Sequence, residues 1–177
     1  MAGRLADAGR AQLARQPGGG TRLSARGTQS GLQTGFHGTA ICFDFGLRRI
    51  GVATGDALTR TAAPLQAVGN GAHGPDWDAI GKHLRDYRPA MLVVGYPYNE
   101  DGSEGKMAAP ATAFAAALAQ RSGLPVARVD ERYSSLEAAA ELKQRRARGE
   151  RRRRVQRAEV DSLAAAIMLE RWLQGEH

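Results

Sequence analysis

Hydrophobic and polar residues alternate, or form short continuous runs, along most of the chain after about residue 38. Runs of four to eight apolar residues bounded by Gly, Pro or charged residues are typical of strands. Residues 90–97 (AMLVVGYP) form a nearly continuous apolar run, which predicts a strand buried on both faces. The five expected strands are residues 39–46, 48–55, 61–68, 90–97 and 125–132.

Helical spacing of apolar residues, or a high alanine content, marks the segments between and after the later strands. The expected helices are residues 75–89, 111–123, 136–149 and a final one from about Arg157 to Gln174. The first three strands follow one another closely and can form an antiparallel meander, whereas strands connected through helices are parallel to their partners. The pattern therefore predicts an α/β domain with a mixed five-stranded sheet flanked by helices.

Residues 1–38 show no sustained hydrophobic period and are rich in Gly, Ala, Arg, Gln, Ser and Thr. We expect them to be a disordered extension, or to lie upstream of the true start of the protein. Residues 39–177 are expected to form one domain. The chain start lacks the apolar stretch of a secretory signal, and no run approaches the roughly 20 apolar residues of a membrane span. These features predict a cytoplasmic protein without membrane association.

Composition narrows the chemistry. The single cysteine, Cys42, excludes an internal disulfide, and it lies in an apolar run where a small buried side chain is expected. The four histidines are scattered without metal-binding spacing. The net charge of +7 favours a polyanionic partner such as nucleic acid.

Asp44 is a carboxylate in the middle of an apolar strand. Alternation places Ile41, Phe43 and Phe45 on one face of this strand, with Cys42 and Asp44 on the other. A buried carboxylate is costly unless another group compensates its charge. One interpretation is a structural salt bridge to Arg48 or Arg49, and the other is a functional site.

Two further acidic positions favour the functional interpretation. Glu131, with Asp130, lies at the carboxyl end of the last expected strand, where open α/β sheets usually place their sites. Asp161 lies near the start of the final helix, where an acid can also interact with the helix dipole. Three carboxylates from separate elements are the ligands that hard divalent cations require, and two such ions can cleave a phosphodiester bond.

Four segments resemble the YqgF/RuvX family of RNase H-like proteins. They are TAICFDFGLRRIGVATGD, MLVVGYPYNEDGS, VDERYSS and VDSLAAAIMLERWL, which occur in the order and spacing of the family between about Thr39 and Gln174. The resemblance implies an RNase H-like fold and a metal-dependent nuclease. The family is described as a Holliday junction resolvase and as the nuclease that matures the 5′ end of pre-16S ribosomal RNA.

The resemblance also implies a catalytic trio that holds the metal, consisting of Asp44, Glu131 and Asp161. Mg²⁺ or Mn²⁺, with two ions in the site, is the expected cofactor. Arg132 belongs to the same motif as Glu131 and would contact a phosphate. The chain departs from the family at Leu47, where Thr is usual, and at Glu159, where a basic residue is expected and a negative charge is found.

Basic residues near the proposed site are the expected substrate contacts. A run of arginines separates the last two expected helices, although such a run can also be a solvated loop. Asn99 lies in a turn that resembles the family and that can equally be an ordinary turn. The expected substrate-binding residues are Arg48, Arg49, Asn99, Arg132, Arg151, Arg152, Arg153 and Arg154.

Alternative functions remain at this point. A phosphotransferase of the actin and sugar-kinase type begins with a similar hairpin, but it needs two such domains. A non-catalytic nucleic-acid-binding module is a second alternative. Within the nuclease class, the expected substrate is precursor rRNA, in a pre-ribosomal particle or free, and the alternative is branched DNA. We expect a monomer or a weak homodimer.

Overall fold

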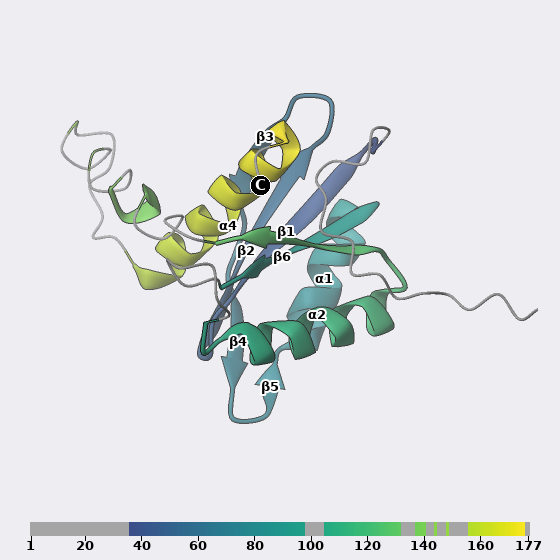
Figure 1. Ribbon diagram of the computed structural model, residues 1–177, viewed down its shortest axis with the longest axis vertical. Coiled ribbons are helices and arrows are strands. Elements are labelled where there is room, and N and C mark those ends of the chain that lie inside the picture. The colour runs from purple at the N-terminus through teal and green to yellow at the C-terminus, as the bar shows by residue number, and fades with distance from the viewer. Residues whose placement is uncertain are drawn as a thin grey trace, which may run out of the picture.

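A computed structural model of the chain describes residues 36–97, 105–131, 137–140, 144, 148 and 156–175 (Figure 1). Its strands are β1 (Thr39–Phe45), β2 (Arg49–Asp56), β3 (Thr61–Pro64), β4 (Val68–Gly71), β5 (Gly74–Pro75), β6 (Met91–Tyr96) and β7 (Val126–Asp130). Its helices are α1 (Trp77–Tyr87), α2 (Ala108–Ser122) and α4 (Arg157–Gln174). No helix in these described ranges is long and apolar enough to cross a membrane.

The strands form one mixed sheet in the order β5-β4-β2-β1-β6-β7, with β3 also paired to β2. β1 and β2 are antiparallel, and their register runs from Thr39 opposite Asp56 to Phe45 opposite Ile50. β6 is parallel to β1, and β7 is parallel to β6. The predicted meander of three antiparallel strands followed by parallel strands is therefore confirmed.

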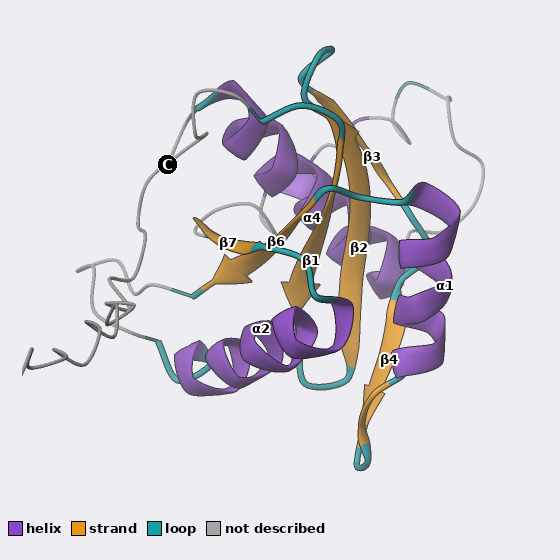
Figure 2. Ribbon diagram, turned by 90° about the vertical axis from the view of Figure 1, so that its right-hand side faces the viewer, coloured by secondary structure: helices purple, strands orange, loops and turns teal. Residues whose placement is uncertain are grey.

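Helices cover both faces of this sheet, with α4 on one face and α1 and α2 on the other (Figure 2). The alternation in β1 divides the core as expected. Cys42 is buried in the cluster under α4, whereas Ile41 and Phe43 are buried in the cluster under α1 and α2. Burial raises the pKa of the Cys42 thiol well above its ordinary value, which fits an inert apolar residue.

The expected third strand, residues 61–68, is divided into two strands. Both halves pair with β2, since Pro64 lies opposite Ala53 and Val68 lies opposite Ile50. Four steps along one strand thus face three steps along the other, which is a β-bulge. Pro64 cannot donate a ladder hydrogen bond, and β4 then turns into a hairpin with β5. The sheet consequently has seven strands rather than five.

Element ends differ slightly from the predicted ones. α2 begins at Ala108 rather than at residue 111, because Pro110 lies in the first helical turn, where its missing N–H costs nothing. α4 matches the expected helix. Within the expected helix over 136–149, residues 137–140 and 144 are helical, Arg148 lies in a turn, and the other residues lie outside the described ones.

Candidate active site

Asp44 lies near the carboxyl end of β1, opposite Gly51 of β2, on the sheet face that α4 covers. Its side chain is half-buried. Burial, and then the negative charges of Glu131 and Asp161, together raise the pKa of this carboxyl from 3.8 to about 7. The other two acids expected from the sequence therefore lie near enough for their charges to act on Asp44.

Glu131 follows directly after β7. Its backbone N–H donates to the carbonyl of Tyr96 at 3.2 Å, so the chain continues alongside β6 beyond the last strand residue. A Cβ on Gly95 would lie 3.1 Å from Oε2 of Glu131 and 3.0 Å from the sulfur of Met168, so the glycine gives these two side-chain ends their present room. Burial, and then the charge of Asp130, raise the pKa of Glu131 to about 7.

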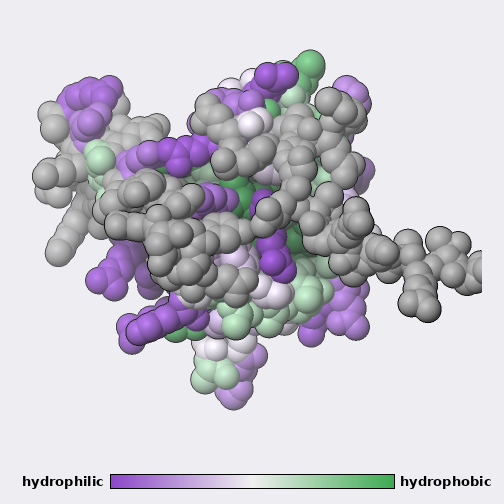
Figure 3. All heavy atoms as spheres, in the orientation of Figure 1, coloured by the Kyte–Doolittle hydropathy of each residue, from purple (hydrophilic) through white to green (hydrophobic). Residues whose placement is uncertain are grey.

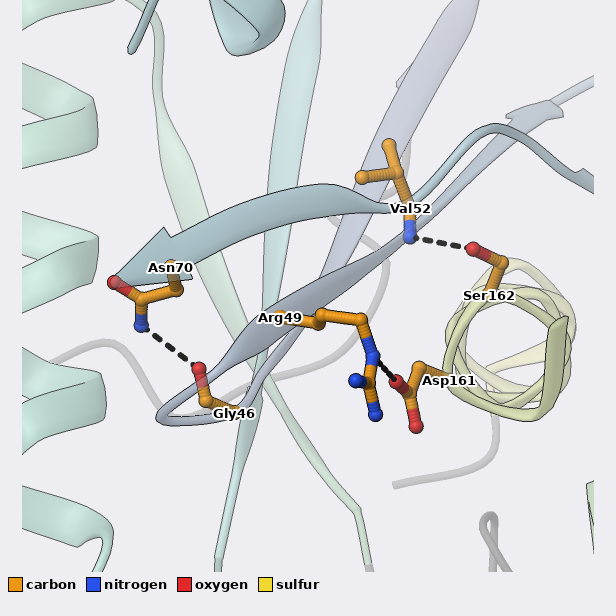
Figure 4. A network of polar contacts seen from close by, with 6 residues as sticks. All are labelled: Gly46, Arg49, Val52, Asn70, Asp161 and Ser162. Atoms are coloured by element: carbon orange, nitrogen blue, oxygen red, sulfur yellow. Dashed lines mark hydrogen bonds and ion pairs between the residues drawn. The ribbon is translucent and has the colours of Figure 1, made fainter. Parts of the chain in front are cut away.

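Asp161 is the fifth residue of α4, and its side chain faces Arg49 at the start of β2 (Figure 4). The Arg49 Nε donates to Oδ2 of Asp161 at 3.0 Å. Helix and strand approach closely here, because a Cβ on Gly51 would lie 2.1 Å from the Asp161 carbonyl oxygen. The side-chain hydroxyl of buried Ser162 accepts from the backbone N–H of Val52 at 3.3 Å and fixes this contact.

Glu159, the acid that stands where a basic residue was expected, lies at the helix start. Its carboxylate accepts from the backbone N–H of Gln156 at 2.7 Å, and together they form a capping box. Glu159 and not Asp161 is thus the acid in the first turn of α4. Asp161, two residues further along the helix, instead pairs with Arg49 of β2.

The side chains of Arg48 and Arg49, both expected to bind substrate, have different surroundings in the structure. Within the described part of the chain neither forms an ion pair with Asp44. Arg49 pairs with Asp161, whereas exposed Arg48 lines a hollow between the β1–β2 turn and the β4–β5 hairpin, together with Asn70 and His73. This hairpin lies at the lower end of the molecule in Figure 1. Pale colours, which mark intermediate hydropathy, are common on the surface there (Figure 3).

Asn70 is a positioning residue that the sequence did not reveal. It is 7% exposed, its Nδ2 donates to the Gly46 carbonyl at 2.8 Å, and its backbone N–H donates to the Arg48 carbonyl at 3.0 Å (Figure 4). These bonds hold the turn that carries both arginines. A lone Asn in a Gly-rich stretch resembles a turn residue, so only the pairing of β4 with β2 identifies it.

Several expected substrate contacts lie outside the described residues. They are Asn99, Arg132, Arg151, Arg152, Arg153 and Arg154.

The donor set fits a divalent cation in its chemistry. The negative charges of Glu131 and Asp161 raise the pKa of Asp44, and a cation bound at this half-buried site would relieve that repulsion. Among the residues the structure describes, however, no three His, Cys, Asp or Glu side chains are already gathered around one point for an ion. One of the three, Asp161, is turned instead to Arg49.

An antiparallel meander continued by parallel strands, with acids on β1, after β7 and on α4, defines the RNase H-like fold. A family model described as "RuvX: Holliday junction resolvase" matches residues 38–175, and the chain belongs to this family.

Relatives with the printed name "Putative pre-16S rRNA nuclease" include one from Xanthomonas oryzae pv. oryzae (strain PXO99A). It is 46% identical over 136 residues, which are 77% of this chain and 87% of that protein. One from Xanthomonas campestris pv. campestris (strain B100) is 45% identical over 135 residues, or 76% and 86%. Among solved structures, Thermus thermophilus RuvC in complex with a Holliday junction substrate matches 79% of this chain and 98% of its own, with a TM-score of 0.46 and 19% identity.

Proposed function

We propose that this chain is a metal-dependent endonuclease that hydrolyses phosphodiester bonds during maturation of the 5′ end of pre-16S ribosomal RNA. The observation that supports the proposal is that Glu131 and Asp161, from separate parts of the chain, lie near enough for their charges to act on half-buried Asp44. The names of the relatives favour precursor rRNA as the polymer. The nuclease unit comprises residues 39–177 and acts in the cytoplasm, on free precursor or in a pre-ribosomal particle, as a monomer or weak homodimer.

Asp44, Glu131 and Asp161 would hold Mg²⁺ or Mn²⁺, with two ions in the site. When bound, such ions activate the attacking water and stabilise the leaving oxygen. The half-buried carboxylate of Glu131 helps to orient the water. Arg49 stands beside Asp161 and can donate to a phosphate oxygen, and Arg132 and Asn99 are the further substrate contacts. Arg48 and the run Arg151–Arg154 bind the flanking phosphates.

Side-by-side digestion of a precursor 16S rRNA end and a four-way DNA junction, at matched salt and Mg²⁺, tests the proposal. We expect cleavage of the RNA, and we expect Asp44→Asn to abolish it while the chain stays folded. Asp56→Asn is the matched control, because Asp56 lies at the other end of the same hairpin and its Oδ1 only accepts from Leu58 and Thr59.

The family description favours branched DNA as a second candidate substrate. Faster cleavage of the junction than of the RNA would establish that alternative. Binding of either polymer without any cleavage would instead indicate a non-catalytic binding module. Unchanged RNA cleavage by the Asp44→Asn protein would overturn the assignment of the catalytic site.

A further inference from the structure

The ion pair between Arg49 and Asp161 places a cation beside one of the three proposed carboxylates. The guanidinium Nε lies 3.0 Å from Oδ2 of Asp161, and the two side chains are 37% and 31% exposed. Asp161 is also one of the two acids whose charges act on Asp44. Arg49 is therefore already paired with one of the carboxylates that are proposed to hold a divalent ion.

The backbones that carry this pair are held firmly, so that only the side chains can separate. The turn before Arg49 is closed by the bond from the Gly46 N–H to the Arg49 carbonyl, at 3.1 Å, and by the Asn70 side chain. Asp161 is held against β2 by the hydrogen bond between Ser162 and Val52. Exchange of partners at Asp161 thus requires a change of rotamer and no movement of β2 or α4.

We propose that Arg49 competes with the divalent cation for Asp161. It neutralises this carboxylate while the site is metal-free, and it releases the carboxylate when the ion binds. The freed guanidinium then lies beside the site, where its planar fork suits a substrate phosphate. This role rests on the proposed nuclease function and deepens it, and it accounts for the absence of three gathered ligands in the described part of the chain.

Arg48 provides a matched control. It is the preceding residue and carries the same charge, but it is exposed and lines the hollow of the β4–β5 hairpin, together with Asn70 and His73. Arg48→Gln and Arg49→Gln therefore change the net charge equally near the acids. Only Arg49→Gln removes the competing ion pair.

The test is a titration of the full chain with Mn²⁺ alone, in which free Mn²⁺ is measured by electron paramagnetic resonance. We expect Arg49→Gln to bind Mn²⁺ about two- to fivefold more tightly than Arg48→Gln, the factor that a half-exposed ion pair is worth. Thermal melts of both variants would check that they are folded. Asp44→Asn identifies the site, since it should weaken binding in any background.

Each outcome of the titration decides a separate point. Equal affinities for the two glutamine variants, or weaker binding by Arg49→Gln, would overturn the competition while leaving the metal site intact. Mn²⁺ binding that Asp44→Asn does not weaken, or no binding by any variant, would overturn the proposed metal site itself. No nuclease substrate is needed, so activity and competition are judged independently.

Discussion

At the scale of single residues, the carboxylate of Asp44 makes stability depend on pH. Its pKa is raised from 3.8 to about 7 by burial and by the charges of Glu131 and Asp161. The unfolded chain therefore loses this proton at lower pH than the folded chain, and the free energy of unfolding falls as pH rises through this window. The charged form of Asp44 thus opposes folding above about pH 7.

Asp44→Asn should remove this cost. In EDTA at pH 8, we expect the variant to be more stable than the natural chain by about 1–3 kcal/mol, after allowance for partial exposure, and to be equally stable near pH 4. Urea denaturation at both pH values measures this difference. Asp56→Asn should show no such pH-dependent gain. A loss of stability in Asp44→Asn at pH 8 would show that Asp44 is compensated in the metal-free protein.

Gly51 allows the close approach of β2 to α4. A Cβ at this position would meet the Asp161 carbonyl oxygen at 2.1 Å, so the helix and strand backbones would have to separate. We expect Gly51→Ala to lower the free energy of unfolding by about 1–3 kcal/mol or more, as overpacking does. Gly69→Ala in β4, where nothing lies within 4 Å of the added carbon, is the control. Equal losses in urea denaturation would contradict this explanation.

At the scale of elements, most strands and helices could be predicted because their patterns are local. Period-two alternation in β1 identified the two faces correctly, and the apolar run of β6 identified a central strand. The division of residues 61–68 into β3 and β4 could not be predicted, because the bulge exists only through pairing with β2. Asn70 and Ser162 were missed for the same reason, since their partners are distant in sequence.

Asn70 connects the β4–β5 hairpin to the turn that carries the arginines. Asn70→Ala would leave the Gly46 carbonyl without its donor, and we expect it to cost about 1–3 kcal/mol of stability. Asn70→Asp should cost at least as much, since a carboxylate cannot donate this bond. Amide hydrogen exchange should quicken at Gly46, which donates to Arg49 across the turn.

His73→Ala, an exposed change at the tip of the same hairpin, is the control for that experiment. It should leave both stability and exchange at Gly46 unaltered. A stable Asn70→Asp protein with slow exchange would show that the turn needs no such support.

At the scale of the whole molecule, the fold places Glu131 and Asp161 near enough to Asp44 for their charges to act on it, and family resemblance could nominate these residues from the sequence. The ion pair between Arg49 and Asp161 could not be predicted from the sequence. The sequence offered Arg48 or Arg49 as a partner for Asp44, but the crossing of α4 over β2 gives Arg49 to Asp161 instead. The choice depends on how two distant elements pack, and no local pattern records that.

The net charge of +7 leads to a last prediction, on binding rather than cleavage. If Arg151–Arg154 contact phosphates, their replacement by Gln removes up to four released counterions when the chain binds single-stranded RNA. The slope of log K against log salt should then flatten by up to about 0.7 for each lost contact. Fluorescence anisotropy with a labelled oligonucleotide in EDTA measures the slope without cleavage.

The control removes four positive charges elsewhere, at exposed Arg60, Lys82, Arg85 and Arg88. A general effect of net charge would act over a Debye length of about 8 Å or more and would weaken binding in both variants, most of all at low salt. A direct contact changes the slope itself, because it fixes the number of ions released. Equal slopes for the two variants would therefore show that Arg151–Arg154 do not contact the RNA phosphates. The proposed substrate contacts near the site would then be Arg48 and Arg49.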